Sequence, residues 1–457
     1  MTSATSVVAP IGHHELLVLL LQIGVLLLAA ILLGRLAVRL GLPAIVGELS
    51  AGVLLGPSLL ANVLPDVADW MFPQEAGQMH LLDSLGQLGV ILLVGFTGMH
   101  VDLKLVRRQG SRAAGVSIAG LVLPLVFGIW LGLLLPDRLR EDGADPTVFA
   151  CFVGVAMCVS AIPVIARTLM DMRLIHRDIG QMILVAGTVD DAVGWVLVSL
   201  VAAMATTAGL TGGDVLTSLG HLGLVMLIVL TVGRLVVRWA MNAALRSGVR
   251  GMPVVAAVVL VVLSSAGTQA LELEAVFGAF LCGVLIGAAK GVDMRPLEPL
   301  NTTVVTVLAP LFFATAGLRM DLTALADVEI ALWALAVVAV AVTGKFLGAF
   351  IGGLFSGVNR WEALALGAGM NARGVIEVII AMIGVRLGLL TVEMYSIIVL
   401  VAVLTSIMAP PLLKLAMSRV EHTAEEDLRE RRVLQLSGAA DEPAAPPPPD
   451  EPGSPAA

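Results

Sequence analysis

The decapeptide "AGTVDDAVGW" (residues 186–195) places two adjacent aspartates, Asp190 and Asp191, in the middle of a long apolar run. The run begins with "IGQMILV" before this stretch and continues with "VLVSLVAAM" after it. One ionised carboxylate at the centre of a membrane helix costs about 2.5–3.5 kcal/mol, and two neighbouring carboxylates oppose each other's ionisation. Acids this costly are rare in membrane helices, so the pair indicates a functional site.

The composition of the chain indicates an all-α polytopic membrane protein. Of its 457 residues, 58% are hydrophobic and only 14% are charged, which is too apolar for a soluble globular protein. No basic region precedes the first apolar run, so we expect no cleaved signal peptide. The three cysteines lie inside apolar runs without disulfide or zinc spacing. We therefore predict no cofactor, no resident metal and no nucleic-acid partner.

Thirteen apolar runs approach the length of about 20 residues that spans a bilayer as a helix. They cover residues 15–34, 42–60, 82–99, 113–135, 147–169, 179–205, 216–238, 252–270, 273–289, 299–318, 328–356, 361–385 and 392–416. Arginine and lysine collect in alternate loops, such as "DLKLVRRQGSR" after the third run and "DMRLIHRD" after the fifth. The positive-inside rule then predicts a protein of the cytoplasmic (plasma) membrane with its N-terminus outside and its C-terminus in the cytoplasm.

These assignments divide the chain into three parts. Residues 1–14 are an extracellular or periplasmic N-terminus, residues 15–416 a transmembrane domain and residues 417–457 a cytoplasmic tail. The tail contains "EHTAEEDLRERR" and the proline-rich "GAADEPAAPPPPDEPGSPAA", and it has too few apolar residues to pack a core, so we expect it to be disordered. No strand–GxGxxG–helix unit appears, so no nucleotide-sensing domain is expected.

The transmembrane part contains an internal repeat. "LPAIVGELSAGVLLG" (42–56) aligns without gaps to "LEAVFGAFLCGVLIG" (273–287), and "TGMHVDL" (97–103) aligns to "AGLRMDL" (316–322). "GVAMCVSAIPVI" (154–165) aligns more loosely to "GAGMNARGVIEV", which begins at residue 367. Each pair is seven runs apart, so the copies enter the membrane in opposite directions. Inverted-topology repeats of this kind are typical of secondary transporters, whose ion sites lie near the midplane on broken helices.

Two repeat partners are poor continuous helices. Pro163 interrupts "CVSAIPVIAR" in the fifth run, because proline removes one hydrogen bond of the helix. "MNARGVIEV" in the twelfth run carries Asn371, Arg373 and Glu377. We expect two broken helices that cross near the midplane, with Arg373 and Glu377 compensating the dipoles of the half-helices. Asn371 is a further candidate for the site.

Lysine is scarce in the chain. Of Lys104, Lys290, Lys345 and Lys414, only Lys345 lies in the middle of an apolar run. A buried lysine can lose its proton, whereas an arginine effectively cannot. Adjacent helical residues diverge by about 100°, so Asp190 can pair with Lys345 while Asp191 faces a water-filled cavity. Glu48 in "VGELSAG" is predicted to act as a buried polar contact or as an acid in an entry funnel.

Together, "VDDAVGW", "SAIPVIARTL", the deep Lys345 and "GMNARGVIEVII" resemble the cation/proton antiporter superfamily over about residues 15–416. The most similar branch contains bacterial sodium/proton antiporters, glutathione-gated potassium efflux transporters and plant endomembrane cation/proton exchangers. The resemblance implies that Asp191 binds the cation and the proton, that Asp190 is the first acid of the pair, that Lys345 is its charge partner and that Ser160 lines the site. It also implies a six-helix core domain that moves against a dimerisation domain, hence a homodimer.

The leading hypothesis is therefore a secondary transporter that exchanges Na⁺ or K⁺ for protons by alternating access, and not an enzyme. A proton-driven exporter of a larger solute stays open, since the aspartates alone do not exclude it. An intramembrane aspartyl protease needs two carboxylates that face each other across a water molecule, which adjacent residues of one helix do not easily provide. A channel is disfavoured, because pores use rings of carbonyls or charges from symmetric chains.

Overall fold

The computed structural model describes residues 11–73, 76–101, 103–174, 177–206, 220, 223–249, 251–271, 273–289, 295–421 and 426. Over these ranges the chain forms helices and connecting turns, and the only extended pairing in them is an isolated bridge between Arg140 and Leu390. The predicted all-helical fold is thereby confirmed.

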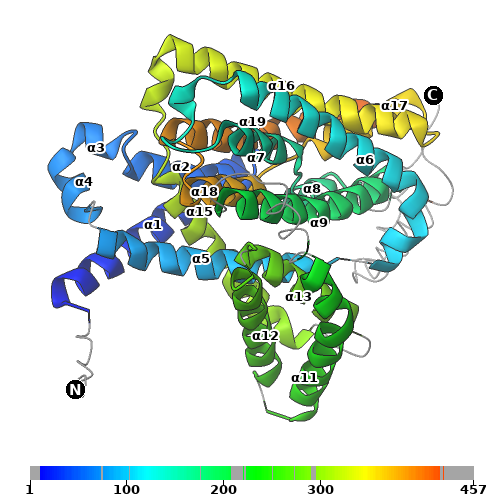
Figure 1. Ribbon diagram of the computed structural model, residues 1–457, viewed down its shortest axis with the longest axis horizontal. Helices are drawn as coiled ribbons and strands as arrows, with labels where there is room; N and C mark the ends of the chain where they lie inside the picture. Colours follow the sequence, from blue (N-terminus) through cyan, green and yellow to red (C-terminus); the bar gives the residue numbers. More distant parts are fainter. Residues whose placement is uncertain are drawn as a thin grey trace, which may run out of the picture.

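The helices of eight residues or more, most of which are labelled in Figure 1, are α1 (His13–Arg39), α2 (Ala44–Leu55), α5 (Ala76–Met99), α6 (Leu103–Leu134), α7 (Pro146–Cys158), α8 (Ile162–Asp171), α9 (Asp178–Thr206), α11 (Arg234–Arg246), α12 (Met252–Gln269), α13 (Ala275–Ala288), α15 (Ala309–Gly317), α16 (Val328–Phe355), α17 (Arg360–Met370), α18 (Val375–Arg386) and α19 (Val392–Met417). Shorter helices are α3 (Leu60–Val63), α4 (Pro65–Met71) and α14 (Glu298–Thr303). Single turns of 3₁₀-helix lie at Asp137–Leu139, Arg295–Leu297 and Thr323–Ala326, and π-helical turns at Val229–Gly233 and Val304–Leu308.

Ten helical segments of the described residues are long and apolar enough to cross a membrane, and the bent pair α17–α18 brings the number to eleven. The predicted run 147–169 is divided between α7 and α8, and the run 273–289 is the 14-residue helix α13. A helix of that length extends about 21 Å, less than the hydrocarbon thickness of about 30 Å. The predicted total of thirteen spans is therefore not confirmed, although each predicted run contains helix.

The helices pack into two bundles. We call α6, α7, α8, α9, α16, α17, α18 and α19 the core bundle, and α1, α2, α5, α11, α12, α13 and α15 the scaffold bundle, because the close helix pairs fall mainly within these two sets. In Figure 1, α6 and α16 run along the upper side of the molecule, while α11 and α12 project below α5. Each bundle contains one group of consecutive helices from the first half of the sequence and one from the second half.

Glycine packing in the scaffold bundle follows the predicted repeat. In α2, Gly47 lies against the backbone of α1 and Gly52 against that of α15; in α13, Gly278 lies against α12 and Gly283 against α5. A Cβ atom at any of these positions would collide with backbone atoms of the neighbouring helix. Small residues permit such close crossings in membrane proteins, so α2 and α13 have equivalent surroundings.

The core bundle uses the same device to hold α16 against α6. Gly348 and Gly352 lie on the backbone of α6, and Gly344 contacts Pro124. These three glycines pack one face of α16 against α6, and Lys345 directly follows Gly344. The lysine side chain is thereby fully buried.

The predicted termini are described only in part. Residues 1–10 of the expected N-terminal segment, and residues 422–425 and 427–457 of the expected tail, lie outside the described residues. The expected start of the tail at residue 417 coincides with the last residue of α19. Beyond it, Val420 and Glu426 are buried rather than exposed.

Candidate functional site

Two interrupted helices meet inside the core bundle. The first interruption, Val159–Ala161, separates α7 from α8; the second, Asn371–Gly374, separates α17 from α18, whose axes are bent by 46°. Pro163 lies in the first turn of α8, where its missing N–H costs no helical hydrogen bond. The predicted breaks in both repeat partners are thus confirmed, and the rest of the site is built around them.

The interruptions contact each other directly. The Ala161 N–H donates to the carbonyl of Ala372 at 3.3 Å, and the Ser160 hydroxyl donates to the carbonyl of Met370 at 3.0 Å. A side chain at Gly374 would collide with Val164 of α8. Backbone groups that a continuous helix would satisfy are therefore used here to join the two broken helices.

Asp190, on α9, is surrounded by donors from three elements. Its carboxylate accepts from Ser117 Oγ of α6 at 2.6 Å and from Lys345 Nζ of α16 at 2.5 Å, and Ser160 Oγ, whose one hydrogen is shared with the Met370 carbonyl, lies 3.3 Å away. Asp190 and Lys345 are both fully buried. A buried ion pair of this kind tolerates the low dielectric because each partner has further hydrogen bonds.

The cations of the site also bind the carboxyl end of α7. Lys345 Nζ donates to the carbonyl of Cys158, and Arg373 donates to the carbonyls of Ala156 and Met157. Cations are favoured at this end because the carbonyls of a helix terminus carry partial negative charge. Arg373 also donates to Glu377 Oε1 at 2.8 Å, four residues ahead on α18.

Asp191 has a different environment from its neighbour. Its side chain is fully buried, but neither carboxylate oxygen has a hydrogen-bond partner among the described residues. The backbone N–H of Ile162, at the start of α8, interacts with the carboxyl group without meeting hydrogen-bond geometry. A buried carboxyl group with unused acceptor capacity is costly unless it binds something.

Asn371 is the second buried polar group at the crossing without a partner. It follows the last residue of α17, is fully buried, and neither atom of its amide group is hydrogen-bonded within the described part of the chain. Its neighbours Met370 and Ala372 supply the carbonyls that join the two breaks. An amide oxygen without a partner at this position can accept a hydrogen bond or coordinate a cation.

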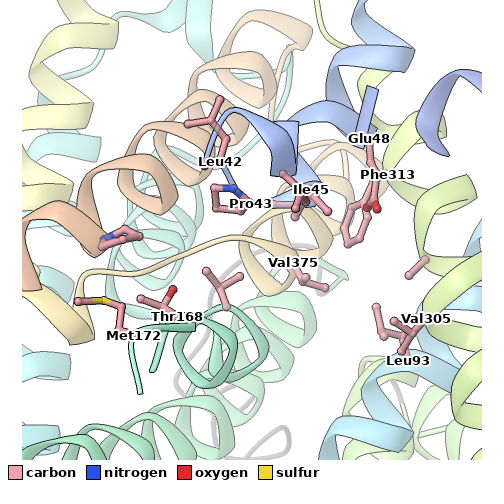
Figure 2. Close-up of a pocket in the computed structure, with 16 residues that line it drawn as sticks. Leu42, Pro43, Ile45, Glu48, Leu93, Thr168, Met172, Val305, Phe313 and Val375 are labelled. Atoms are coloured by element: carbon pink, nitrogen blue, oxygen red, sulfur yellow. The ribbon is translucent and has the colours of Figure 1, made fainter. Parts of the chain in front are cut away.

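A cavity of about 400 Å³ separates the two bundles on one side of the crossing. Figure 2 shows Glu48 of α2 across this cavity from Thr168 and Met172, which belong to α8 and the turn after it. Val164 and Val375, from the first turns of α8 and α18, also line it. The cavity therefore leads from the side of Glu48 toward the crossing.

A second cavity of about 420 Å³ lies at the opposite ends of α2, α15, α18 and α19. It is lined by Leu55, Arg319, Val385 and Tyr395, among others. Asp191 lines neither cavity. The described structure thus has a recess on each side of the bundle interface and a buried carboxyl group that borders neither recess.

Ser117 and Ser406 are site residues that the sequence did not reveal. Ser117 lies in "GVSIAGLVLP" on α6, and a single serine in an apolar helix usually bonds to its own backbone. In the structure it instead donates to Asp190. Ser406 of α19 was equally inconspicuous and donates to the carbonyl of Arg373.

Comparison with known proteins gives consistent matches. The family described as "Sodium/hydrogen exchanger, transmembrane" matches residues 24–418. The Na⁺/H⁺ antiporter NhaS4 of Synechocystis sp. is 31% identical over 87% of this chain and 97% of its own length. Cation/H⁺ antiporter 17 of Arabidopsis thaliana is 30% identical over 93% of this chain. The chain spans only about half, 51%, of the length of this plant relative.

The fold also matches a solved structure. The sodium proton antiporter MjNhaP1 from Methanocaldococcus jannaschii superposes with a TM-score of 0.65 over 88% of this chain and 99% of that protein, at 15% identity. At this identity the match reports on the arrangement of the helices and not on individual side chains.

Proposed function

The chain belongs to the sodium/hydrogen exchanger family, and from that premise we propose that it exchanges a monovalent cation, Na⁺ or K⁺, for protons across a membrane. In this proposal it is a secondary transporter that works by alternating access and has no enzymatic activity. The observation that carries the proposal is the contrast between Asp190, whose carboxylate accepts from Ser117 and Lys345, and Asp191, whose carboxylate has no donor among the described residues.

Asp191 is the proposed exchange group. A proton or a monovalent cation can neutralise its carboxyl group, and the two compete for the same oxygens. The neutralised group can cross the apolar barrier between the bundles, whereas the empty anion crosses poorly because charge transfer into a low dielectric is costly. That asymmetry couples the inward movement of one ion to the outward movement of the other.

Neutral oxygens are proposed to complete the cation site. Ser160 lies at the break between α7 and α8, and Asn371 lies at the other break with an amide oxygen that is free in the described structure. Na⁺ and K⁺ are hard cations that bind carboxylate, carbonyl and hydroxyl oxygens. Asp191 would supply the negative charge, and Ser160 and Asn371 would replace part of the water shell.

The other charged groups are proposed to hold the crossing together. Lys345 pairs with Asp190, and Arg373 pairs with Glu377 while binding the end of α7. These contacts offset the dipoles of the half-helices. They also keep Asp190 engaged, which leaves Asp191 as the carboxyl group available to ions.

Access is proposed to alternate between the two cavities at the bundle interface. Glu48 borders the first cavity and would attract cations into it. A relative displacement of the core bundle against the scaffold bundle would connect Asp191 to one cavity at a time. We further propose that two copies associate. We also propose that the C-terminus lies in the cytoplasm, and a reporter fused after Arg419 would test this orientation.

The experiment is a measurement of proton flux in proteoliposomes. The purified protein is reconstituted in liposomes with an acidic lumen, so that protons are driven outward, and Na⁺, K⁺ and Li⁺ are added in turn to the outside. We expect at least one cation to dissipate the proton gradient. Asp191→Asn should abolish that response, because Asn keeps the size of Asp but cannot bind and release a proton.

Asp66→Asn is the matched control, because Asp66 is an exposed carboxylate on α4. It should leave the flux unchanged. Exchange near the wild-type rate in Asp191→Asn would move the site elsewhere, and silence toward all three cations in the wild type would favour a different transported solute.

A further inference from the structure

The chain beyond α19 folds back onto the core bundle. Val420 is 8% exposed and belongs to the same buried apolar cluster as Leu169 of α8 and Ile179 of α9. The guanidinium group of Arg419 lies 5.2 Å from the centroid of the Trp361 ring, in the first turn of α17. The chain after α19 therefore contacts α17 and joins the apolar cluster to which α8 and α9 contribute.

A buried ion pair fastens this segment further along. Glu426 Oε2 lies 3.0 Å from Arg177 Nε, and the two side chains are only 4% and 3% exposed. Arg177 also donates to the carbonyls of Val420 at 3.3 Å and Glu421 at 2.9 Å. One arginine thus binds both backbone carbonyls and a carboxylate of the chain beyond α19.

The same carboxylate binds the start of α9. Glu426 Oε1 accepts from the backbone N–H of Asp178 at 2.8 Å, and Asp178 is the first residue of that helix. The first N–H groups of a helix lack intrahelical partners and carry partial positive charge. Glu426 therefore caps α9 from a distant part of the chain.

Helix α9 is the element that carries the proposed exchange group. Asp191 lies thirteen residues after Asp178, about 20 Å along an uninterrupted helix. An α-helix is axially stiff, so a constraint on its first turn limits both its shift along the axis and its rotation. Arg419 and Glu426 contact α17, Arg177 and the start of α9 in the core bundle, so these residues would move together with the site.

We propose that Glu426 is a positioning residue for ion exchange: through Arg177 and the N-terminus of α9 it fixes the helix that carries Asp191. The inference rests on the proposed function for its transport readout. Ser418–Glu421 and Glu426 are then attached to the core bundle and belong to the transport machinery.

The test uses the full-length protein in proteoliposomes and compares Glu426→Gln with Glu421→Gln. Glu421 is the matched control, because it is five residues away and its side chain is exposed while only its carbonyl is used. Glu426→Gln should raise the half-saturating cation concentration by about two- to thirtyfold, the usual range for residues that act on a site through packed neighbours. The maximal rate should change less, and Glu421→Gln should match the wild type.

Arg177→Gln and the double variant Arg177→Gln, Glu426→Gln separate pairing from independent effects. Removal of one side chain leaves the other buried without its opposite charge, so the double variant should be no worse than either single variant. A half-saturating concentration unchanged in Glu426→Gln, or a loss of maximal rate alone that follows lowered thermal stability, would overturn the positioning role.

Hydrogen exchange gives a readout that does not depend on transport. In Glu426→Gln, the amides of the first turns of α9 should exchange faster than in the wild type, and Glu421→Gln should not differ. If the wild type transports none of the three cations, the proposed function fails while this measurement still decides whether Glu426 fixes α9. Unchanged protection of α9 would remove the basis of the inference.

Discussion

The scaffold bundle and the core bundle are both built largely from apolar helices, but only in the core bundle do the described residues include ion pairs whose two partners are both buried. In the scaffold bundle, Gln22 donates to the carbonyl of Met71 and Thr268 to that of Ser265, so neutral side chains bond to backbone. In the core bundle, the ion pair of Asp190 and Lys345 is buried beside two helix breaks. Charge is buried where the backbone is interrupted, since the interruption exposes carbonyls and N–H groups that can bind it.

The difference assigns separate tasks to the two bundles. Glycine crossings such as that of Gly52 on α15 leave no room for relative movement inside the scaffold bundle. Between the bundles, one described ion pair joins Glu274 at the start of α13 to Arg386 at the end of α18. The comparison predicts a rigid scaffold and a core whose chemistry depends on balanced charge, and it can be tested at three levels of effect.

The largest effect is expected at the buried pair. Lys345→Ala leaves Asp190 buried without its charge partner, which should lower the free energy of unfolding by about 3–5 kcal/mol. Asp190→Asn combined with Lys345→Gln removes both charges and keeps the size of both side chains. The double variant should therefore recover much of the loss, as measured by thermal melting of the detergent-solubilised protein.

Lys414→Ala is the matched control for this prediction, because Lys414 is exposed near the end of α19. It should melt with the wild type. A double variant as unstable as Lys345→Ala would mean that the packing of the lysine chain, and not the charge balance, holds the crossing together.

A smaller effect is expected from the scaffold crossings. A Cβ atom at Gly52 would meet the backbone of α15, and a Cβ atom at its repeat partner Gly283 would meet that of α5. Backbone atoms cannot move aside as a side chain can, so each glycine-to-alanine change should cost about 1–3 kcal/mol of unfolding free energy. The two losses should be similar, because the repeat gives the two positions equivalent neighbours.

Gly24→Ala provides the contrast in the same bundle. Gly24 is exposed on α1, and a Cβ atom there meets nothing within 4 Å. Alanine should stabilise this helix by roughly 0.5–1 kcal/mol. If Gly52→Ala behaved like Gly24→Ala, the scaffold would be more pliable than its packing indicates.

Much of this arrangement could be predicted from the sequence because it depends on local signals. The costly pair Asp190 and Asp191, the proline after "VSAI" and the aligned glycines each restrict the structure through one residue type at one position. The 100° between adjacent helical residues predicts that the two acids have different surroundings, and in the structure only Asp190 contacts Lys345. Their roles in exchange remain a proposal.

The remainder depends on how helices are rotated and how deep they lie, which periodicity does not report. Ser117 donates to Asp190 only because α6 presents that face at that height. The charged residues after α19 predicted a tail that cannot pack, yet Glu426 is buried against Arg177, 249 residues earlier in the chain. Composition measures the apolar residues available to a core, and a few charged residues can still dock where a helix end offers partners.

The smallest effect is expected at an exposed ion pair outside the membrane helices. Arg138 Nη1 lies 2.7 Å from Asp327 Oδ2, and the side chains are 54% and 39% exposed. The hydrogen bond from Arg138, together with the N–H of Glu329 at the start of α16, lowers the pKa of Asp327 below its usual value. A carboxyl group whose pKa is lower in the folded state stabilises the fold above its unfolded pKa of about 3.9 and loses that contribution as the pH falls through the folded pKa.

Asp327→Asn should therefore lower the melting temperature slightly at pH 7, less than Gly52→Ala does, because exposed pairs contribute little and asparagine still caps a helix. The difference from the wild type should shrink in high salt, where exposed charges are screened, and again as the pH falls below about 4. A loss as large as that of Lys345→Ala would break the comparison, because it would show that exposed and buried pairs hold this protein together equally.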